Sequence, residues 1–266
     1  MVNKTANAQV PADHRREVML RELAWHEKHS ENRDTKLAFL YEPPVFDFIV
    51  DAALDFLDGK PGEAVLDIAS GEGKESLEMA RRGWQVIAID LSLSQLKRTR
   101  QRVTEQNPNR PVFYVQANAE QLPFAQGSLR IIHGKAIIHH LDLDIAANEI
   151  KRVLATNGKA VFAEPMKHHP LFWLSRRLTP SLRTQDEHPL TYKELNYFVE
   201  AFDQHVISEA FLLAPLAYII RILPGGEKPF LKVINWLHRV DRQVLRLLPF
   251  LKTLAWYDSV YLQKGK

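Results

Sequence analysis

The segment that most constrains the fold is a short apolar run that ends in two glycines and leads into a helix. Residues 64–69 are apolar except for Asp67, and Gly71 and Gly73 follow directly. Glycines here let the backbone pass close to a ligand, because no Cβ stands in the way. Helical spacing over residues 74–82 completes a strand, loop and helix unit. Such a unit is typical of α/β proteins that bind a nucleotide-like ligand on the loop.

The alternation of strands and helices continues along the middle of the chain. Further strand-like runs lie at residues 85–90, 112–116, 130–138, 159–164 and 255–263, and helical spacing lies at residues 45–57, 93–106 and 144–154. Thr191 and Glu194 form a capping box that opens another helix. Strands separated by crossover helices indicate an α/β fold with a doubly wound, mostly parallel, Rossmann-like sheet of seven strands.

Three additions surround this sheet in the sequence. We expect residues 1–60 to form an N-terminal helical cap, with the ligand-binding domain over residues 61–266. Residues 166–190 are rich in Pro, His and Arg and are predicted to cover the carboxyl edge of the sheet as a lid, where α/β ligands bind. Residues 220–252 form a predicted helical insertion before the last strand.

Composition narrows the class of protein. The chain has 266 residues, a formal charge of +3 and no cysteine. The small charge does not favour a nucleic-acid partner, and the lack of cysteine excludes disulfides and thiol nucleophiles. The start of the chain lacks the apolar core of a secretory signal, and the longest apolar run, residues 210–220, is too short to cross a bilayer. We expect a cytoplasmic protein without a metal site; its oligomeric state is left open.

Asp90 supplies the second part of the predicted ligand site. It ends the run at residues 85–90 and lies 19 positions after Gly71 (90 − 71), a separation at which an acid accepts ribose hydroxyls. Capping of the next helix is an alternative role that can coexist. Ser76 stands where a dinucleotide fingerprint has its third glycine, which weakens that interpretation. Asp67 instead suits a cationic ligand end, such as the amino group of a methionine moiety.

Residues 65–73, Asp90 and residues 116–124 together resemble the class I S-adenosylmethionine-dependent methyltransferases. The resemblance is strongest to the type 11 group that is similar to ubiquinone and menaquinone C-methyltransferases, and it covers residues 64–164. It implies S-adenosyl-L-methionine as the cofactor. The cofactor-binding residues that we expect are Asp67, Ala69, Ser70, Gly71, Gly73, Asp90, Leu91, Asn118, Ala119 and Lys135.

Within this set, the resemblance places Asn118 and Ala119 at the adenine edge and Lys135 beside the methionine part. The sequence departs from the family pattern at two points. Asn118 stands where an aspartate is usual, although its amide oxygen can still accept a hydrogen bond from the adenine amino group. Residues 128–130 replace the common Phe-Asp entry to the fourth strand, which affects local packing.

The acceptor side is predicted from polar residues that follow the fourth and fifth strands. A sulfonium methyl group is already activated, so the enzyme mainly aligns the acceptor, and a neutral histidine can take a proton from an acceptor hydroxyl. We expect His139 and His168 to lie on the acceptor side, with Glu164 orienting one of them. The alternative is that these histidines pack or cap. Tyr41 could cover the sulfonium or belong to the core, and residues 183–189 could bind an anion or form a solvated turn.

The helical insertion combines an apolar stripe with basic residues on its other side. The basic set is Lys228, Lys232, His238, Arg239, Arg242, Arg246 and Lys252. Residues 228–252 could therefore rest on an anionic membrane surface, or could pack the stripe on the domain and expose the basic side to water.

The function that these features favour is transfer of a methyl group to the oxygen or carbon of a small, hydrophobic or lipid-like acceptor. Three alternatives remain open at this point. They are a related enzyme that transfers another group from the same cofactor, an RNA methyltransferase, and a non-catalytic module that binds a ligand or a membrane.

Overall fold

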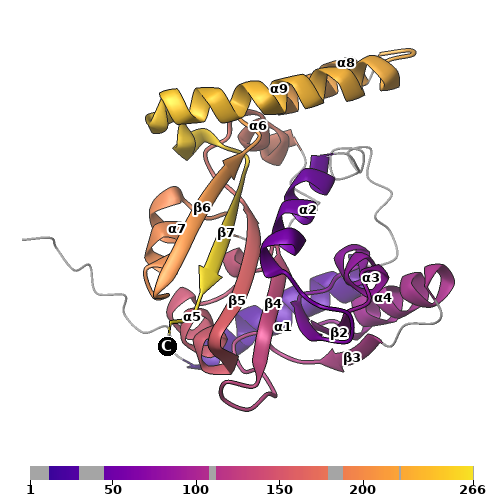
Figure 1. The fold of residues 1–266 in the computed structure, drawn as a ribbon, viewed down its shortest axis with the longest axis vertical. Helices are drawn as coiled ribbons and strands as arrows, with labels where there is room; N and C mark the ends of the chain where they lie inside the picture. The colour runs from indigo at the N-terminus through magenta and orange to yellow at the C-terminus, as the bar shows by residue number, and fades with distance from the viewer. Residues whose placement is uncertain (1–11, 30–44, 108–111, 179–187, 222, 266) are drawn as a thin grey trace, which may run out of the picture.

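A seven-stranded sheet forms the centre of the molecule in the computed structural model, which describes residues 12–29, 45–107, 112–178, 188–221 and 223–265 (Figure 1). The strand order is β3-β2-β1-β4-β5-β7-β6. The strands are β1 (Ala64–Ile68), β2 (Gln85–Asp90), β3 (Val112–Gln116), β4 (Leu129–Lys135), β5 (Leu154–Pro165), β6 (Gln204–Ala210) and β7 (Tyr257–Gln263).

The direction of the strands brings most of their carboxyl ends to one edge of the sheet. Strands β1 to β5 pair in parallel, whereas β7 runs antiparallel to both β5 and β6. Strand β6 therefore points in the same direction as β5. We call the edge where β1 to β6 end the carboxyl edge.

Helices cover both faces of the sheet. The α-helices are α1 (Ala12–His29), α2 (Val45–Leu57), α3 (Lys74–Arg81), α4 (Leu93–Gln106), α5 (Leu143–Val153), α6 (Pro170–Leu178), α7 (Tyr192–Val199), α8 (Tyr218–Arg221) and α9 (Glu227–Leu247). Short 3-10 helices are η2 (Ile138–His140), η4 (Ala214–Ala217) and η5 (Pro249–Leu254). The alternating strands and helices confirm the predicted doubly wound α/β fold.

Two apolar clusters fix the sheet between its helix layers. On one face, Leu66 and Phe162 pack with Phe198 of α7. On the other face, Val65 packs with Leu54 of α2 and with residues of α3. Helix α2, which the sequence assigns to an N-terminal cap, thus packs directly on the sheet.

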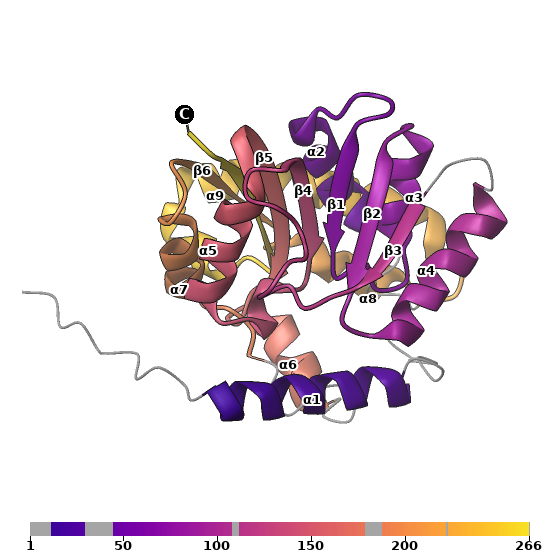
Figure 2. The same ribbon diagram turned by 90° about the horizontal axis from the view of Figure 1, so that it is seen from below.

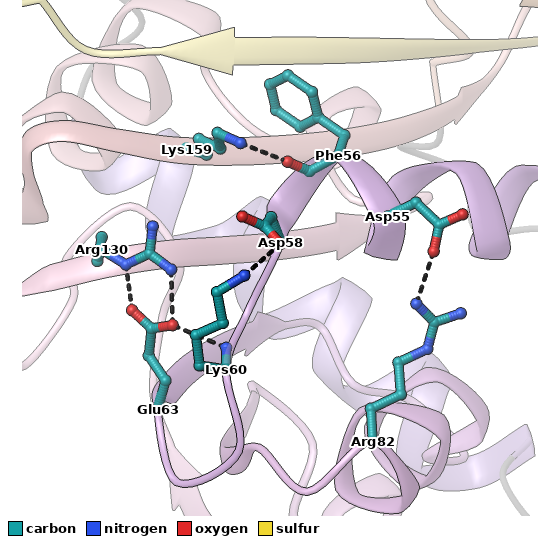
Figure 3. A network of polar contacts seen from close by, with 8 residues as sticks. All are labelled: Asp55, Phe56, Asp58, Lys60, Glu63, Arg82, Arg130 and Lys159. Atoms are coloured by element: carbon teal, nitrogen blue, oxygen red, sulfur yellow. Dashed lines mark hydrogen bonds and ion pairs between the residues drawn. The ribbon is translucent and has the colours of Figure 1, made fainter.

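The edge opposite the carboxyl edge is held by polar contacts (Figure 3). The Arg130 side chain, at the start of β4, donates to both carboxylate oxygens of Glu63, which precedes β1. The Lys159 Nζ donates to the Phe56 carbonyl at 2.8 Å and joins β5 to α2. These contacts connect the start of β4 to the residue before β1, and β5 to α2.

Helix α1 crosses the carboxyl edge, where Figure 2 shows it lying beneath the strand ends. Its side chains contact three loops there. Asn118 after β3 donates to the Met19 Sδ at 3.5 Å, Ser92 after β2 donates to the Glu27 carboxylate at 2.7 Å, and the His140 Nδ1 lies 3.3 Å from the Glu22 carboxylate. Helix α1 therefore covers the loops in which the ligand site is expected.

Several element limits differ from those expected. Strand β4 ends at Lys135 and not at residue 138, because residues 138–140 turn into η2. Strand β5 begins at Leu154, directly after α5, and β6 at the outer edge was not expected from the sequence. Within the described residues, the structure has no helix with the length and apolar character needed to span a membrane.

Candidate functional site

The glycine loop between β1 and α3 leaves open space for a ligand at Gly71. Gly71 has φ +52°, and a Cβ built there meets only the Ala69 carbonyl oxygen, at 3.9 Å. The Gly71 N–H donates to the Asp90 Oδ2 at 3.0 Å, and the Ser92 N–H donates to the Asp90 Oδ1 at 2.9 Å. The two loops that were predicted to share a ligand thus lie side by side, with the Asp90 carboxylate between them.

Helix α4 packs against the same loop through Thr99. A Cβ on Gly73 would lie 2.6 Å from the Thr99 Cγ2, so glycine is required there by close packing as well as by its φ of +74°. The Thr99 hydroxyl donates to the Gly71 carbonyl at 2.8 Å and lies 3.4 Å from the Ser70 hydroxyl. Gly73 is therefore a structural position, whereas Gly71 faces open space.

The environment of Asp90 raises its pKa. Burial is the largest cause, and the negative charges of Asp67 and Glu27 add to it. The backbone N–H groups of Ser92 and Gly71 act in the opposite direction. Ligand hydroxyls that donate to this carboxylate would lower its raised pKa, because hydrogen bonds to the charged form favour ionisation.

Asp67 is tied to its neighbours in the sheet. The Ser76 hydroxyl of α3 donates to its Oδ2, and the His133 Nδ1 of β4 lies 2.8 Å from its Oδ1. Asp67 is almost fully buried. Both carboxylate oxygens of Asp67 thus have partners within the protein. The sequence predicted a contact with a ligand amino group and did not predict these two partners.

Lys135 forms an ion pair with Glu75 of α3 at the end of β4. Burial acts to raise the pKa of Glu75, but the charge and hydrogen bond of Lys135, together with smaller contributions, hold that pKa below the ordinary value. The Leu91 carbonyl accepts from the Gln116 Nε2 at 2.9 Å, which joins the loops after β2 and β3. Lys135 and Leu91 were both expected to bind the cofactor, and both bond here to other residues of the protein.

Asn118 and Ala119 follow β3 on the same edge. The Asn118 Oδ1 accepts from the Glu120 N–H at 2.9 Å, and its amide nitrogen faces the Met19 sulfur of α1. Ala119 is half-buried against the core. The position expected for an adenine ring is thus bordered by α1.

His139 and Glu164 form a buried pair at the ends of β4 and β5. The His139 Nδ1 lies 2.7 Å from the Glu164 Oε2, while the Glu164 Oε1 accepts from the N–H groups of Ile137 and Ile138 at 2.9 Å each. A neutral His139 that donates from Nδ1 to Glu164 keeps the lone pair of its Nε2 for another partner. This is the arrangement of an oriented general base.

His168 is not brought to this pair. It is exposed in the turn before α6, whereas its neighbour His169 is buried, with its Nε2 3.1 Å from the Leu212 carbonyl. Burial lowers the pKa of His169. The turn points His169 inward, and among the described residues no hydrogen bond or ion pair joins His168 to His139 or Glu164, so a role of His168 on the acceptor side stays a prediction.

A row of three acids crosses the outer strands, and the sequence analysis missed it. The register places Glu164 of β5 and Glu209 of β6 on either side of Asp258 of β7. The Tyr192 hydroxyl donates to Glu209 at 2.9 Å, and the Lys252 ammonium lies 3.0 Å from Glu209. Asp258 is fully buried, and neither of its carboxyl oxygens has a hydrogen-bond partner among the described residues. Burial raises its pKa well above the ordinary value, and the charge of Glu209 adds to the effect.

Tyr41 and residues 183–187 lie outside the described residues. His188 is described, and its Nε2 lies 3.4 Å from the Glu194 carboxylate. Among the described residues, no three His, Asp or Glu side chains are grouped so that they could hold a metal ion.

The fold and the loop geometry together define a class I methyltransferase fold: a doubly wound sheet with a glycine loop after β1 and an acid at the end of β2. Residues 66–162 match the methyltransferase domain family. This matched stretch is about a third of the chain, and it contains both the glycine loop after β1 and Asp90 at the end of β2.

Two relatives with assigned names are similar to part of the chain. A demethylmenaquinone methyltransferase of Beutenbergia cavernae is 31% identical over 153 residues, which cover 54% of this chain and 61% of the relative. A 2-phytyl-1,4-naphtoquinone methyltransferase of Trichormus variabilis is 30% identical over 118 residues, covering 43% of this chain and 52% of the relative. The chain thus spans only about half to three fifths of the length of these relatives.

Solved structures share the fold at low sequence identity. Phosphoethanolamine N-methyltransferase 2 of Haemonchus contortus, in complex with S-adenosyl-L-methionine, gives a TM-score of 0.60 at 15% identity and covers 91% of this chain and 60% of its own. Geranyl diphosphate C-methyltransferase of Streptomyces coelicolor gives a TM-score of 0.58 at 17% identity, covering 82% of this chain and 76% of its own. These likenesses confirm the predicted fold.

Proposed function

We propose that this protein is an S-adenosylmethionine-dependent methyltransferase that methylates a small hydrophobic acceptor. The observation that carries the proposal is the open space at Gly71 beside the Asp90 carboxylate. A bare backbone next to a carboxylate at the end of β2 suits a nucleoside whose ribose hydroxyls donate to that acid. The methyltransferase family match over residues 66–162 supports the same cofactor.

The residues that would hold the cofactor come from the ends of β1, β2 and β3 at the carboxyl edge. Residues 69–73 would lie under it, Asp90 would bind the ribose, and Asn118 with Ala119 would border the adenine. When bound, S-adenosyl-L-methionine supplies a methyl group that its positive sulfur has already activated. The protein therefore has to hold the acceptor in line and to exclude water. Helix α1, which crosses the same loops, is suited to exclude water.

The His139–Glu164 pair provides the proton-accepting group of the proposed reaction. Glu164 fixes the His139 ring through Nδ1, and the His139 Nε2 takes the proton that an acceptor hydroxyl loses as its oxygen or ring carbon gains the methyl group. Glu164 itself is held by two backbone N–H groups, so the orientation of the ring is fixed before the acceptor binds.

The acceptor class is suggested by the named relatives. Both relatives are named for quinone substrates, which combine an apolar ring with oxygen substituents. A reduced naphthoquinone, in which these oxygens are hydroxyls, would place a hydroxyl near His139 and keep its ring among apolar neighbours. We therefore propose a hydroxylated aromatic acceptor with apolar substituents.

The proposal is tested by incubating the protein with S-adenosyl-L-methionine and reduced naphthoquinones with and without an isoprenoid tail. We expect S-adenosylhomocysteine and a singly methylated naphthoquinol, both detected by mass spectrometry. Binding of the cofactor without methylation of any of these compounds would refute the acceptor class. Failure to bind the cofactor in calorimetry would refute the proposed function as a whole.

A further inference from the structure

Helix α9 lies on the outside of the molecule (Figure 1) and carries a row of exposed basic side chains. Lys228, Lys232, Arg239 and Arg246 are all exposed and follow the helical repeat, so they form one stripe. Arg242 is exposed beside them. We call these five residues the basic stripe.

An apolar stripe runs along the helix next to the basic stripe. It consists of Val233, Trp236, Val240 and Leu247, spaced three, four and seven residues apart. Trp236 is 58% exposed and Leu247 is 74% exposed, although both are large apolar side chains. Exposed apolar residues continue beyond both ends of the helix, with Ile219 at 59% in α8 and Phe250 at 70% in η5.

The charge of this surface is strongly one-sided. Asp241 is the only acidic residue in residues 228–247. It is fully buried and accepts from the N–H groups of Leu212, Leu213 and Ala214 at 2.8–3.0 Å. Among the described residues, no carboxylate forms an ion pair with the basic stripe. The stripe is therefore available to an anionic partner.

The inner side of α9 fixes the helix to the domain. Phe230 and Ile234 are fully buried in a cluster with Trp256 and Phe211. Asp241 adds hydrogen bonds to the turn after β6. Since β6 points in the same direction as β5, this turn lies at the carboxyl edge, beside the row of Glu164, Asp258 and Glu209. A partner surface that binds α9 would therefore lie close to the proposed acceptor side of the site.

We propose that the outer side of α9 docks on an anionic lipid bilayer. The basic stripe would contact lipid phosphates and carboxylates, while Trp236 and Leu247 would enter the interface with their apolar atoms. Tryptophan suits this depth because its ring is apolar and its N–H can bond to water or headgroups. Docking on the bilayer does not require methyltransferase activity. The further idea that the bilayer supplies a hydrophobic acceptor rests on the proposed function.

The test is co-sedimentation of the full chain with phosphatidylcholine vesicles that contain or lack phosphatidylserine. We expect binding only with phosphatidylserine, and weaker binding as salt is added. The Lys232→Glu/Arg239→Glu variant should bind at least about twentyfold more weakly, at about fivefold per basic residue lost. The Trp236→Ala variant should also bind more weakly, through loss of apolar contact.

The matched control is Lys97→Glu/Arg100→Glu, which makes the same change of charge on the exposed side of α4. It should bind vesicles as the unchanged protein does. Equal loss in both double variants would show that net charge alone acts, and unchanged binding of Lys232→Glu/Arg239→Glu would exclude α9; either result overturns the proposal. Binding of RNA through the same stripe without binding to vesicles would also overturn it. The affinity for S-adenosylhomocysteine, measured by calorimetry, should be the same in every variant. This measurement separates membrane docking from the proposed function.

Discussion

Replacing Gly71 with alanine tests whether the loop after β1 approaches a ligand. The new methyl group meets no protein atom closer than 3.9 Å, so it fits the folded protein. Its cost to the free energy of unfolding comes from the left-handed backbone, φ +52°, and amounts to about 1–2 kcal/mol. Ala69 already adopts φ 55° two residues earlier, which shows that this loop accommodates an alanine in that conformation.

The effect of Gly71→Ala on ligand binding should exceed its effect on folding. The methyl group would fill the space through which the ligand reaches the backbone. An extra methyl group in a packed site costs about 1–3 kcal/mol. At about 1.4 kcal/mol per factor of ten, the dissociation constant of S-adenosylhomocysteine should rise about 5- to 150-fold. Isothermal titration calorimetry measures this change directly, and thermal unfolding measures the cost to the fold.

Gly127→Ala is the matched control. Gly127 has φ +65° and open space around its Cβ position, but it precedes β4 at the opposite edge of the sheet. It should lose similar stability and bind the ligand normally. Gly73→Ala is not a suitable comparison, because its Cβ would collide with Thr99 and disturb the fold. If Gly71→Ala and Gly127→Ala bind S-adenosylhomocysteine equally well, the loop does not approach the ligand and the reasoning is refuted.

Three further substitutions test other parts of the site. Asp90→Ala should weaken cofactor binding by about 1.5–3 kcal/mol in calorimetry, because the ribose hydroxyls lose a charged acceptor; an unchanged dissociation constant would reject this role. His139→Asn should lower kcat about 100- to 10,000-fold and leave cofactor affinity intact, and an unaltered kcat would exclude a base. The raised pKa of Asp258 means that the folded protein retains a proton which the unfolded chain releases, so stability falls as the pH rises from the ordinary aspartate pKa through the raised one. Asp258→Asn should abolish that fall in thermal unfolding, and identical pH profiles would contradict it.

The central strands could be predicted because burial leaves a strong local signal. Strands β2 and β3 and helix α4 begin and end where the sequence pattern indicates, since apolar runs and amphipathic spacing follow directly from packing on two faces. Strand β6 escaped prediction for the converse reason. It lies at the outer edge of the sheet, is largely exposed, and carries Val206 at 63% exposure, so its residues have no consistent apolar face.

Those parts of the candidate site could be predicted whose positions follow from the order and direction of the strands alone. Gly71 and His139 follow β1 and β4, while Asp90 and Glu164 lie at the ends of β2 and β5, so the parallel sheet brings Gly71 to Asp90 and His139 to Glu164. Local sequence could not tell which of His168 and His169 turns inward, because that depends on the turn before α6.

The row formed by Glu164, Asp258 and Glu209 was hidden for a different reason. Its three acids meet only through the register of three strands that are far apart in the sequence. The sequence of a single strand does not determine its register with the others. The docking of α1 through Glu22 and Glu27 depends in the same way on distant loops.

A crystal structure with S-adenosylhomocysteine tests the central claim most directly. We predict density for the nucleoside over Gly71, with both ribose hydroxyls within hydrogen-bond distance of the Asp90 carboxylate and the sulfur directed toward His139. Absence of the compound from this position at saturating concentration, or its binding elsewhere on the chain, would contradict the account.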